Sequence, residues 1–199
     1  MTMRAAPRWR LRAPGERWLE EFRAEVQGAP FSYEAVGATR DDRVGVPAGF
    51  DLDHNRVQLG NGEAVWERAC GAVREWKMFP APWTRISRAD TPIRVGEVVA
   101  MQARAFGVWW VNACRIVYVI EEAAPVRRFG FAYGTLLAHV ESGEERFSVE
   151  MGENGEVWYD VRAFSRPRYL PVRLMRPLAR RLQGRFVRDS KRAMQEAVR

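Results

Sequence analysis

One short stretch of this 199-residue chain concentrates side chains that could transfer a proton. It contains His139, Glu141 and Glu144, with Ser142 and Glu145 between and beside them. A histidine next to carboxylates can act as a general acid or base near neutral pH, and such groups collect on loops of a rigid scaffold. We interpret the stretch as a loop between two strands. His139, Glu141 and Glu144 are therefore the candidate catalytic residues, and the alternative interpretation is a solvated surface turn.

A set of aromatic residues forms a second group of interest. These side chains would share the concave side of a curved sheet, where apolar walls with a few hydroxyl groups are typical of small-molecule pockets. The same side chains would also fill an ordinary close-packed core, and this alternative stays open. The candidate ligand-binding residues are Trp110, Tyr118, Tyr133, Phe147 and Tyr159.

Metal sites and disulfides find little support in the sequence. The residues His54, His139, Cys70 and Cys114 lack the paired spacing that is typical of a metal site. The two cysteines lie far apart, one in a helical pattern and the other in a strand pattern, as expected for buried reduced thiols. We therefore predict no metal site and no cofactor.

The formal charge of +7 raises the question of an anionic partner. Lys77 and Lys191 are the only lysines, so the basic content is almost all arginine, which a genome-wide compositional bias would also produce. A solvated helix face explains the arginine-rich stretch 166–181 without a partner. Nucleic acid is therefore a disfavoured partner, and peripheral membrane contact stays open.

Length and composition favour a single domain over residues 1–199. A chain that is 47% hydrophobic can fill one core of this size. No apolar run approaches the roughly 18 residues needed to cross a bilayer. Residues 1–14 are basic but lack the apolar segment of a signal peptide, so we expect a flexible N-terminal arm and a cytoplasmic protein.

The elements that must position the candidate residues follow from periodicity. Apolar side chains at helical spacing predict helices over 15–28 and about 65–78, with a short strand over 51–59 between them. From 83 to 164 the chain has β character, including strands over 95–105, 108–120 and 128–136. Strict alternation along strand 108–120 would place Tyr118 on the same face as Trp110.

A hairpin over 145–164 precedes a long final helix. A three-residue loop 153–155, with Gly155 left-handed, would align Met151 with Val157 and Phe147 with Val161 and so keep one face apolar. The helix that follows extends to residue 199 and places most of its arginines away from an apolar stripe. The predicted stripe consists of Met175, Leu178, Leu182, Phe186, Ala193 and Ala197.

This order of elements resembles the helix-grip fold of the birch pollen allergen, the START lipid-transfer domains and the aromatic polyketide cyclases. We therefore predict an α+β fold in which a curved antiparallel sheet wraps around a long C-terminal helix, with its core over 51–199. The resemblance implies a cavity between the sheet and that helix.

Several short motifs carry a closer resemblance. They are FSY at 31–33, LGNG at 59–62, GFAYGTL at 130–136, ESGEE at 141–145 and FSRP at 164–167. From about Trp18 to the end, the chain is similar to a bacterial and plant family known as domain of unknown function nineteen-ninety. It departs from that family where Ala138 and Val140 flank His139, because a proline is expected on one or both sides. The resemblance implies no established activity, cofactor or catalytic residue.

These observations lead to three functional hypotheses. The first is a cytoplasmic, non-enzymatic protein that binds a small apolar or amphipathic molecule between the sheet and the last helix. The second is an enzyme of the hydrolase or cyclase type on the same fold, using His139 with Glu141 or Glu144. The third is a module that binds a polyanion, either nucleic acid or an anionic membrane, through the arginine-rich helix.

Overall fold

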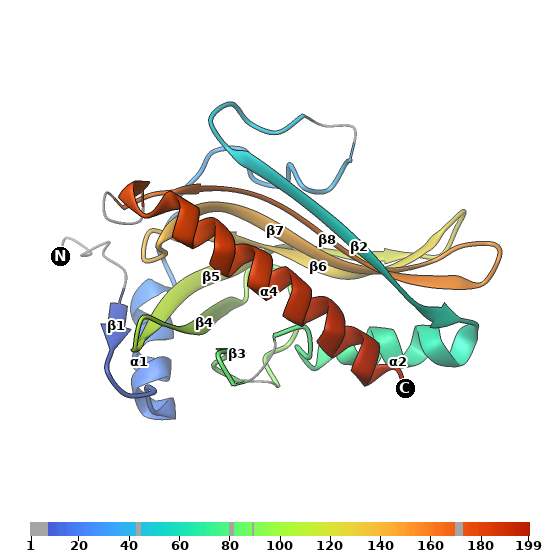
Figure 1. The fold of residues 1–199 in the computed structure, drawn as a ribbon, viewed down its shortest axis with the longest axis horizontal. Helices are drawn as coiled ribbons and strands as arrows, with labels where there is room; N and C mark the ends of the chain where they lie inside the picture. The colour runs from blue at the N-terminus through green and yellow to red at the C-terminus, as the bar shows by residue number, and fades with distance from the viewer. Residues whose placement is uncertain (1–7, 43–44, 80–81, 89, 170–172) are drawn as a thin grey trace.

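The computed structural model describes residues 8–42, 45–79, 82–88, 90–169 and 173–199. Figure 1 shows a curved sheet with helices on both of its faces. The strands are β1 (Arg8–Arg10), β2 (Asp51–Asn61), β3 (Thr84–Ile86), β4 (Val98–Ala105), β5 (Val108–Glu122), β6 (Arg127–Thr135), β7 (Glu141–Met151) and β8 (Glu156–Pro167). The helices are α1 (Glu16–Val26), α2 (Glu63–Arg74) and α4 (Arg176–Ala197).

The eight strands form one antiparallel sheet with the order β2-β8-β7-β6-β5-β4-β3, and β1 pairs with β5. The long helix α4 runs diagonally across the concave face, while α1 lies at the β4–β5 end of the sheet (Figure 1). This is the helix-grip arrangement, so the predicted fold class is confirmed. Among the described residues, no helix is both long and apolar enough to cross a membrane.

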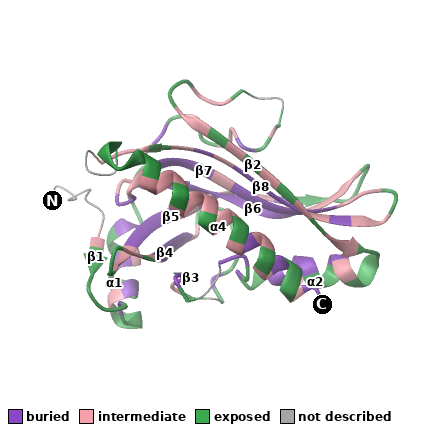
Figure 2. Cartoon of the chain, in the orientation of Figure 1, coloured by how far each residue is buried: buried purple, intermediate pink, exposed green. Residues whose placement is uncertain are grey.

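The main core fills the concave side where α2 and the second half of α4 meet the sheet. Figure 2 shows the central strands buried and α4 only partly buried. Phe186 of the predicted stripe packs on this core, but the fully buried positions that follow are Ser190 and Met194 rather than Ala193. The Ser190 hydroxyl lies 2.9 Å from the hydroxyl of Tyr159 and joins α4 to β8.

The predicted register of the long hairpin is confirmed. Met151 pairs with Val157 and Phe147 pairs with Val161. Gly155 has a φ of 79°, which is the left-handed conformation that the three-residue loop requires. This register sends alternate residues of β7 to opposite faces of the sheet.

Two predicted boundaries are wrong. Residues 141–145, expected in a loop, form the first part of β7. All of them pair with β8, and Glu144 and Glu145 also pair with β6. Residues 8–10, expected within a flexible arm, form β1 against β5. Because the acidic residues of 141–145 lie on a paired strand, alternation divides them between the two faces of the sheet.

A β-bulge in β5 overturns the expected alternation of that strand. Ile116 pairs with Tyr133, but Tyr118 pairs with Ala132, so the register shifts between the two pairs. The extra residue turns Tyr118 to the convex face, where its hydroxyl lies 2.7 Å from that of Thr39. Tyr118 therefore does not share the concave face with the other aromatic candidates.

The connection between α1 and β2 lies on the convex face and is held there by close contact. Tyr33 occupies the space beside Gly134, because a Cβ atom at residue 134 would lie 2.0 Å from the Tyr33 hydroxyl. The same hydroxyl donates a hydrogen bond of 2.7 Å to Glu144. Glycine at this position thus makes room for the segment that covers the outer face.

Candidate ligand cavity

A cavity of about 310 Å³ lies between the concave face of the sheet and the N-terminal half of α4. Small residues of the sheet, including Ala103, Ala105 and Ala163, line it where larger side chains would fill the space. Its larger apolar lining residues include Trp83, Met101, Phe106, Trp110, Phe164, Met175, Leu178, Leu182 and Phe186. A largely apolar hollow with a few polar groups is the usual form of a small-molecule site.

The five predicted ligand-binding residues divide into three groups. Trp110 and Tyr133 line the cavity. Phe147 and Tyr159 are fully buried in the adjoining core and do not line it. Tyr118 lies on the convex face as a consequence of the β-bulge. The structure thus brings two of the five to the cavity wall.

Glu145 places a carboxyl group on the cavity wall. It pairs in register with Tyr133 on one side and Ala163 on the other, which fixes it on the concave face. The Tyr133 hydroxyl donates a hydrogen bond of 2.8 Å to the Glu145 carboxylate. Burial raises the pKa of Glu145 to about 7. This carboxyl group can therefore exchange a proton near neutral pH.

Glu141 is the first residue of β7 and, like Glu145, faces the cavity. Both of its carboxylate oxygens accept hydrogen bonds of 2.7 Å from the side-chain amide of Gln183 on α4. Burial raises its pKa. Glu141 thus fastens α4 to the sheet across the cavity.

His139 lines the cavity but has the wrong properties for a general base. Its Nδ1 atom accepts a hydrogen bond of 2.9 Å from the backbone N–H of Glu141. Burial lowers its pKa to about 3, so the ring is neutral at physiological pH. The role predicted for His139 as an acid or base therefore does not fit its surroundings.

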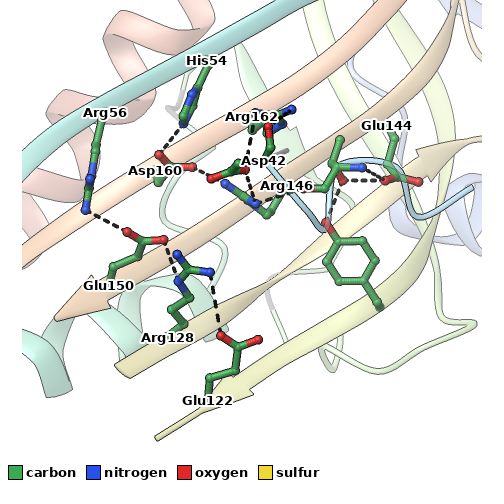
Figure 3. A network of polar contacts seen from close by, with 12 residues as sticks. Asp42, His54, Arg56, Glu122, Arg128, Glu144, Arg146, Glu150, Asp160 and Arg162 are labelled. Atoms are coloured by element: carbon green, nitrogen blue, oxygen red, sulfur yellow. Dashed lines mark hydrogen bonds and ion pairs between the residues drawn. The ribbon is translucent and has the colours of Figure 1, made fainter. Parts of the chain in front are cut away.

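Glu144 is among the residues that border the cavity. Its carboxylate, however, points toward the connection on the convex face (Figure 3). Its carboxylate accepts hydrogen bonds from the Tyr33 hydroxyl at 2.7 Å, from the backbone N–H groups of Gly37 and Thr39 at 2.7 and 2.9 Å, and from the Thr39 hydroxyl. Through these contacts, Glu144 anchors residues 33–39 to the sheet. Glu144 is therefore separated from Glu141 and Glu145 by the thickness of the sheet.

A network of charged side chains continues along the convex face (Figure 3). Arg146 lies 2.8 Å from Asp160 and 2.9 Å from Asp42, and His54 lies 2.7 Å from Asp160. A second group links Glu150 to Arg56. Since the network lies on the opposite face from the cavity, it stabilises the fold rather than forming part of the site.

The arginine-rich stretch is largely engaged in contacts within the protein. Arg176 pairs with Asp51 at 2.7 Å, and Arg180 pairs with Asp53 at 2.6 Å, so both join α4 to β2. Arg168 donates to a backbone carbonyl. These contacts favour a structural role for this surface over a polyanion site. Among the described residues, no cluster of three or more metal-ligating side chains occurs.

Sequence reasoning missed Asn112 and Glu145 as residues of the cavity wall. Asn112 interrupts an apolar run of the central strand β5, and Glu145 lies two residues before Phe147 on a face that is apolar further along β7. A polar residue in the apolar face of a strand was the signal in both cases.

Comparison with known proteins shows the family to which this chain belongs. A UPF0548 protein of Dictyostelium discoideum is 32% identical over 94% of this chain and 94% of its own length. A UPF0548 protein of Deinococcus radiodurans is 35% identical over 94% of this chain and 98% of its own length. The crystal structure of a hypothetical protein from Helicobacter pylori matches the fold with a TM-score of 0.55 at 10% identity, over 86% of this chain and 100% of that chain. The model of the domain of unknown function family (DUF1990) matches residues 32–193, and the chain therefore belongs to this family.

Proposed function

We propose that the protein binds a small apolar or amphipathic molecule in the cavity between the sheet and α4. The supporting observation is the cavity itself, about 310 Å³ in volume and lined mostly by apolar side chains. Protein interiors are otherwise close-packed, so a hollow of this size between the sheet and a helix calls for an occupant. The few polar groups on its wall would orient the bound molecule.

Filling the cavity from α4 tests this proposal. Leu182→Trp should weaken binding of the neutral fluorophore Nile red by about tenfold or more, because the indole would occupy the volume that a ligand needs. Arg181→Trp is the matched control, since Arg181 is the exposed neighbour of Leu182 on the same helix. Fluorescence titration measures both, and native mass spectrometry of the purified wild type detects a ligand that copurifies.

Two results would contradict the proposal. One is the absence of saturable Nile red binding to the wild type together with no copurifying small molecule. The other is equal affinity of the Leu182→Trp and Arg181→Trp variants, which would place the bound dye outside the cavity. Thermal unfolding of each variant verifies that the comparison is made between folded proteins.

A second candidate function is proton transfer on the bound molecule, and it is favoured by the pair of Glu145 and Tyr133. The Glu145 carboxylate would serve as the base, because it lines the cavity and its pKa of about 7 lies near physiological pH. Incubation of 2-decanone in deuterated water is the test, since base catalysis exchanges the C–H groups beside the carbonyl. Exchange should rise with pH through about 7 and be lost in Glu145→Gln. Exchange no faster than in buffer alone would rule this candidate out.

A further inference from the structure

Two buried side chains on the cavity wall carry N–H groups that lack an acceptor among the described residues. They belong to Asn112 and His139, which are only 3% and 7% exposed and which both line the cavity. The backbone fixes the orientation of each. The N–H of Val140 donates to Asn112 Oδ1 at 3.2 Å, and the N–H of Glu141 donates to His139 Nδ1 at 2.9 Å. The free donors are therefore Asn112 Nδ2 and His139 Nε2.

The residues that fix these two donors, Val140 and Glu141, are consecutive in the chain. Asn112 from β5 and His139 from the turn before β7 therefore border the same part of the cavity wall. Buried polar groups are almost always hydrogen-bonded in folded proteins. Two donors without an acceptor among the described residues, on the same part of the cavity wall, favour a ligand that brings an acceptor atom to them.

The two carboxylate groups that β7 places on the cavity wall, in contrast, already have hydrogen-bond partners, although the second oxygen of Glu145 has none among the described residues. Both oxygens of Glu141 accept from Gln183, and Glu145 accepts from Tyr133. A ligand that brings a further donor, such as an amine, would have to compete with these protein groups. A ligand that brings an acceptor would complete hydrogen bonds that the protein leaves open.

Charge decides which kind of acceptor fits. His139 is neutral, because burial lowers its pKa to about 3. The nearby guanidinium group of Arg168 donates to the carbonyl of Leu137, and Arg168 does not line the cavity. The carboxyl groups of Glu141 and Glu145 do line it and, in their ionised forms, would repel an anion. A carboxylate ligand would therefore meet neutral donors and acidic neighbours, whereas an uncharged oxygen meets no such penalty.

We infer that the bound molecule is apolar and carries an uncharged acceptor oxygen of the ketone, aldehyde or ester class, held by Asn112 Nδ2 and His139 Nε2. This inference rests on the proposed function and specifies its ligand. The apolar part of the molecule would lie along Trp110, Leu178 and Leu182, which line the same cavity.

A series of ligands with the same chain length tests the inference. Displacement of Nile red by 2-decanone, decanoate and decylamine compares a neutral carbonyl, an anion and a cation. We expect 2-decanone to bind about tenfold or more tightly than either charged ligand. Asn112→Asp keeps the acceptor for the Val140 N–H but removes the donor. This variant should weaken 2-decanone by about tenfold and strengthen decylamine.

A pair of substitutions at His139 separates donor loss from a change of shape. The amide of asparagine reaches only the position of Nδ1, so His139→Asn should weaken 2-decanone by about three- to tenfold. The amide nitrogen of glutamine lies near the position of Nε2, so His139→Gln should recover most of that loss. If decanoate or decylamine binds best, or if these variants bind 2-decanone like the wild type while Nile red still binds, the inference is wrong and the proposed function stands. Failure of the wild type to bind Nile red and every ligand of the series would overturn both.

Discussion

At pH 8, the free energy of unfolding of Glu145→Gln should exceed that of the wild type by about 3 kcal/mol. In the folded protein, burial raises the pKa of Glu145 from its ordinary value of 4.5 to about 7. The folded state therefore binds this proton more tightly than the unfolded state, and its stabilising effect is complete below pH 4.5 and is lost as the pH rises through 7. Glutamine can still accept the Tyr133 hydrogen bond and has no charge to desolvate, so the variant avoids this loss.

His139 has the opposite effect over part of the same range, which makes the comparison of variants informative. Its pKa falls from 6.5 to about 3 on folding, so its contribution to stability is present above 6.5 and is lost as the pH falls toward 3. Between pH 4.5 and 6.5 the two effects cancel in the wild type. Relative to the wild type, Glu145→Gln should therefore gain stability as the pH rises through this window, and His139→Gln should lose stability.

Urea unfolding at pH 4, 5, 6, 7 and 8 measures these differences. The difference between Glu145→Gln and the wild type should be near zero at pH 4 and should reach its full size above pH 7. A difference that is constant over this range would mean that the Glu145 carboxyl group titrates normally in the folded protein. Its placement on a buried cavity wall would then be wrong.

The second large effect is expected on the convex face. Arg146→Met should lower the free energy of unfolding by about 3–5 kcal/mol, because it leaves the buried Asp160 carboxylate without its guanidinium partner. The side chains of Arg146 and Asp160 are only 3% and 4% exposed, so water cannot replace the lost contact. Among the described residues, the contact that Asp160 would keep is the one with the His54 ring.

The matched control removes both charges at once. Arg146→Met combined with Asp160→Leu leaves no uncompensated buried charge, so we expect it to be more stable than Arg146→Met alone. Urea unfolding of the two single variants and the double variant gives the coupling energy between the two side chains. Single variants whose losses simply add in the double variant would show that the ion pair is not coupled.

Local patterns predicted much of the fold because the decisive residues act on their immediate neighbours. Gly155 sets the loop, and the loop sets the pairing of Met151 with Val157. The bulge before Tyr118 could not be predicted in this way, because an unbroken alternation of apolar residues is compatible with either face. It depends on how β5 follows the curvature of the sheet, which is a tertiary property.

The candidate site was predicted less well than the fold, and one pair of residues shows why. Glu144 and Glu145 are adjacent and chemically identical, yet one anchors the outer connection and the other faces the cavity. The assignment depends on where β7 begins, and the acidic composition of 141–145 pointed to a loop. The order of strands and helices could thus be predicted from periodicity, whereas the face occupied by each carboxylate required the register of three strands.

The position of α4 in the chain has a consequence for biosynthesis. Every strand that α4 covers precedes it, so the ribosome releases the sheet before the helix that forms the other wall of the cavity. Until then the inner surface of the sheet is open to water and to other nascent or misfolded chains. A hydrophobic compound present during translation could adhere to this surface and become enclosed when the helix docks, so occupancy in the cell would depend on conditions at synthesis as well as on equilibrium affinity.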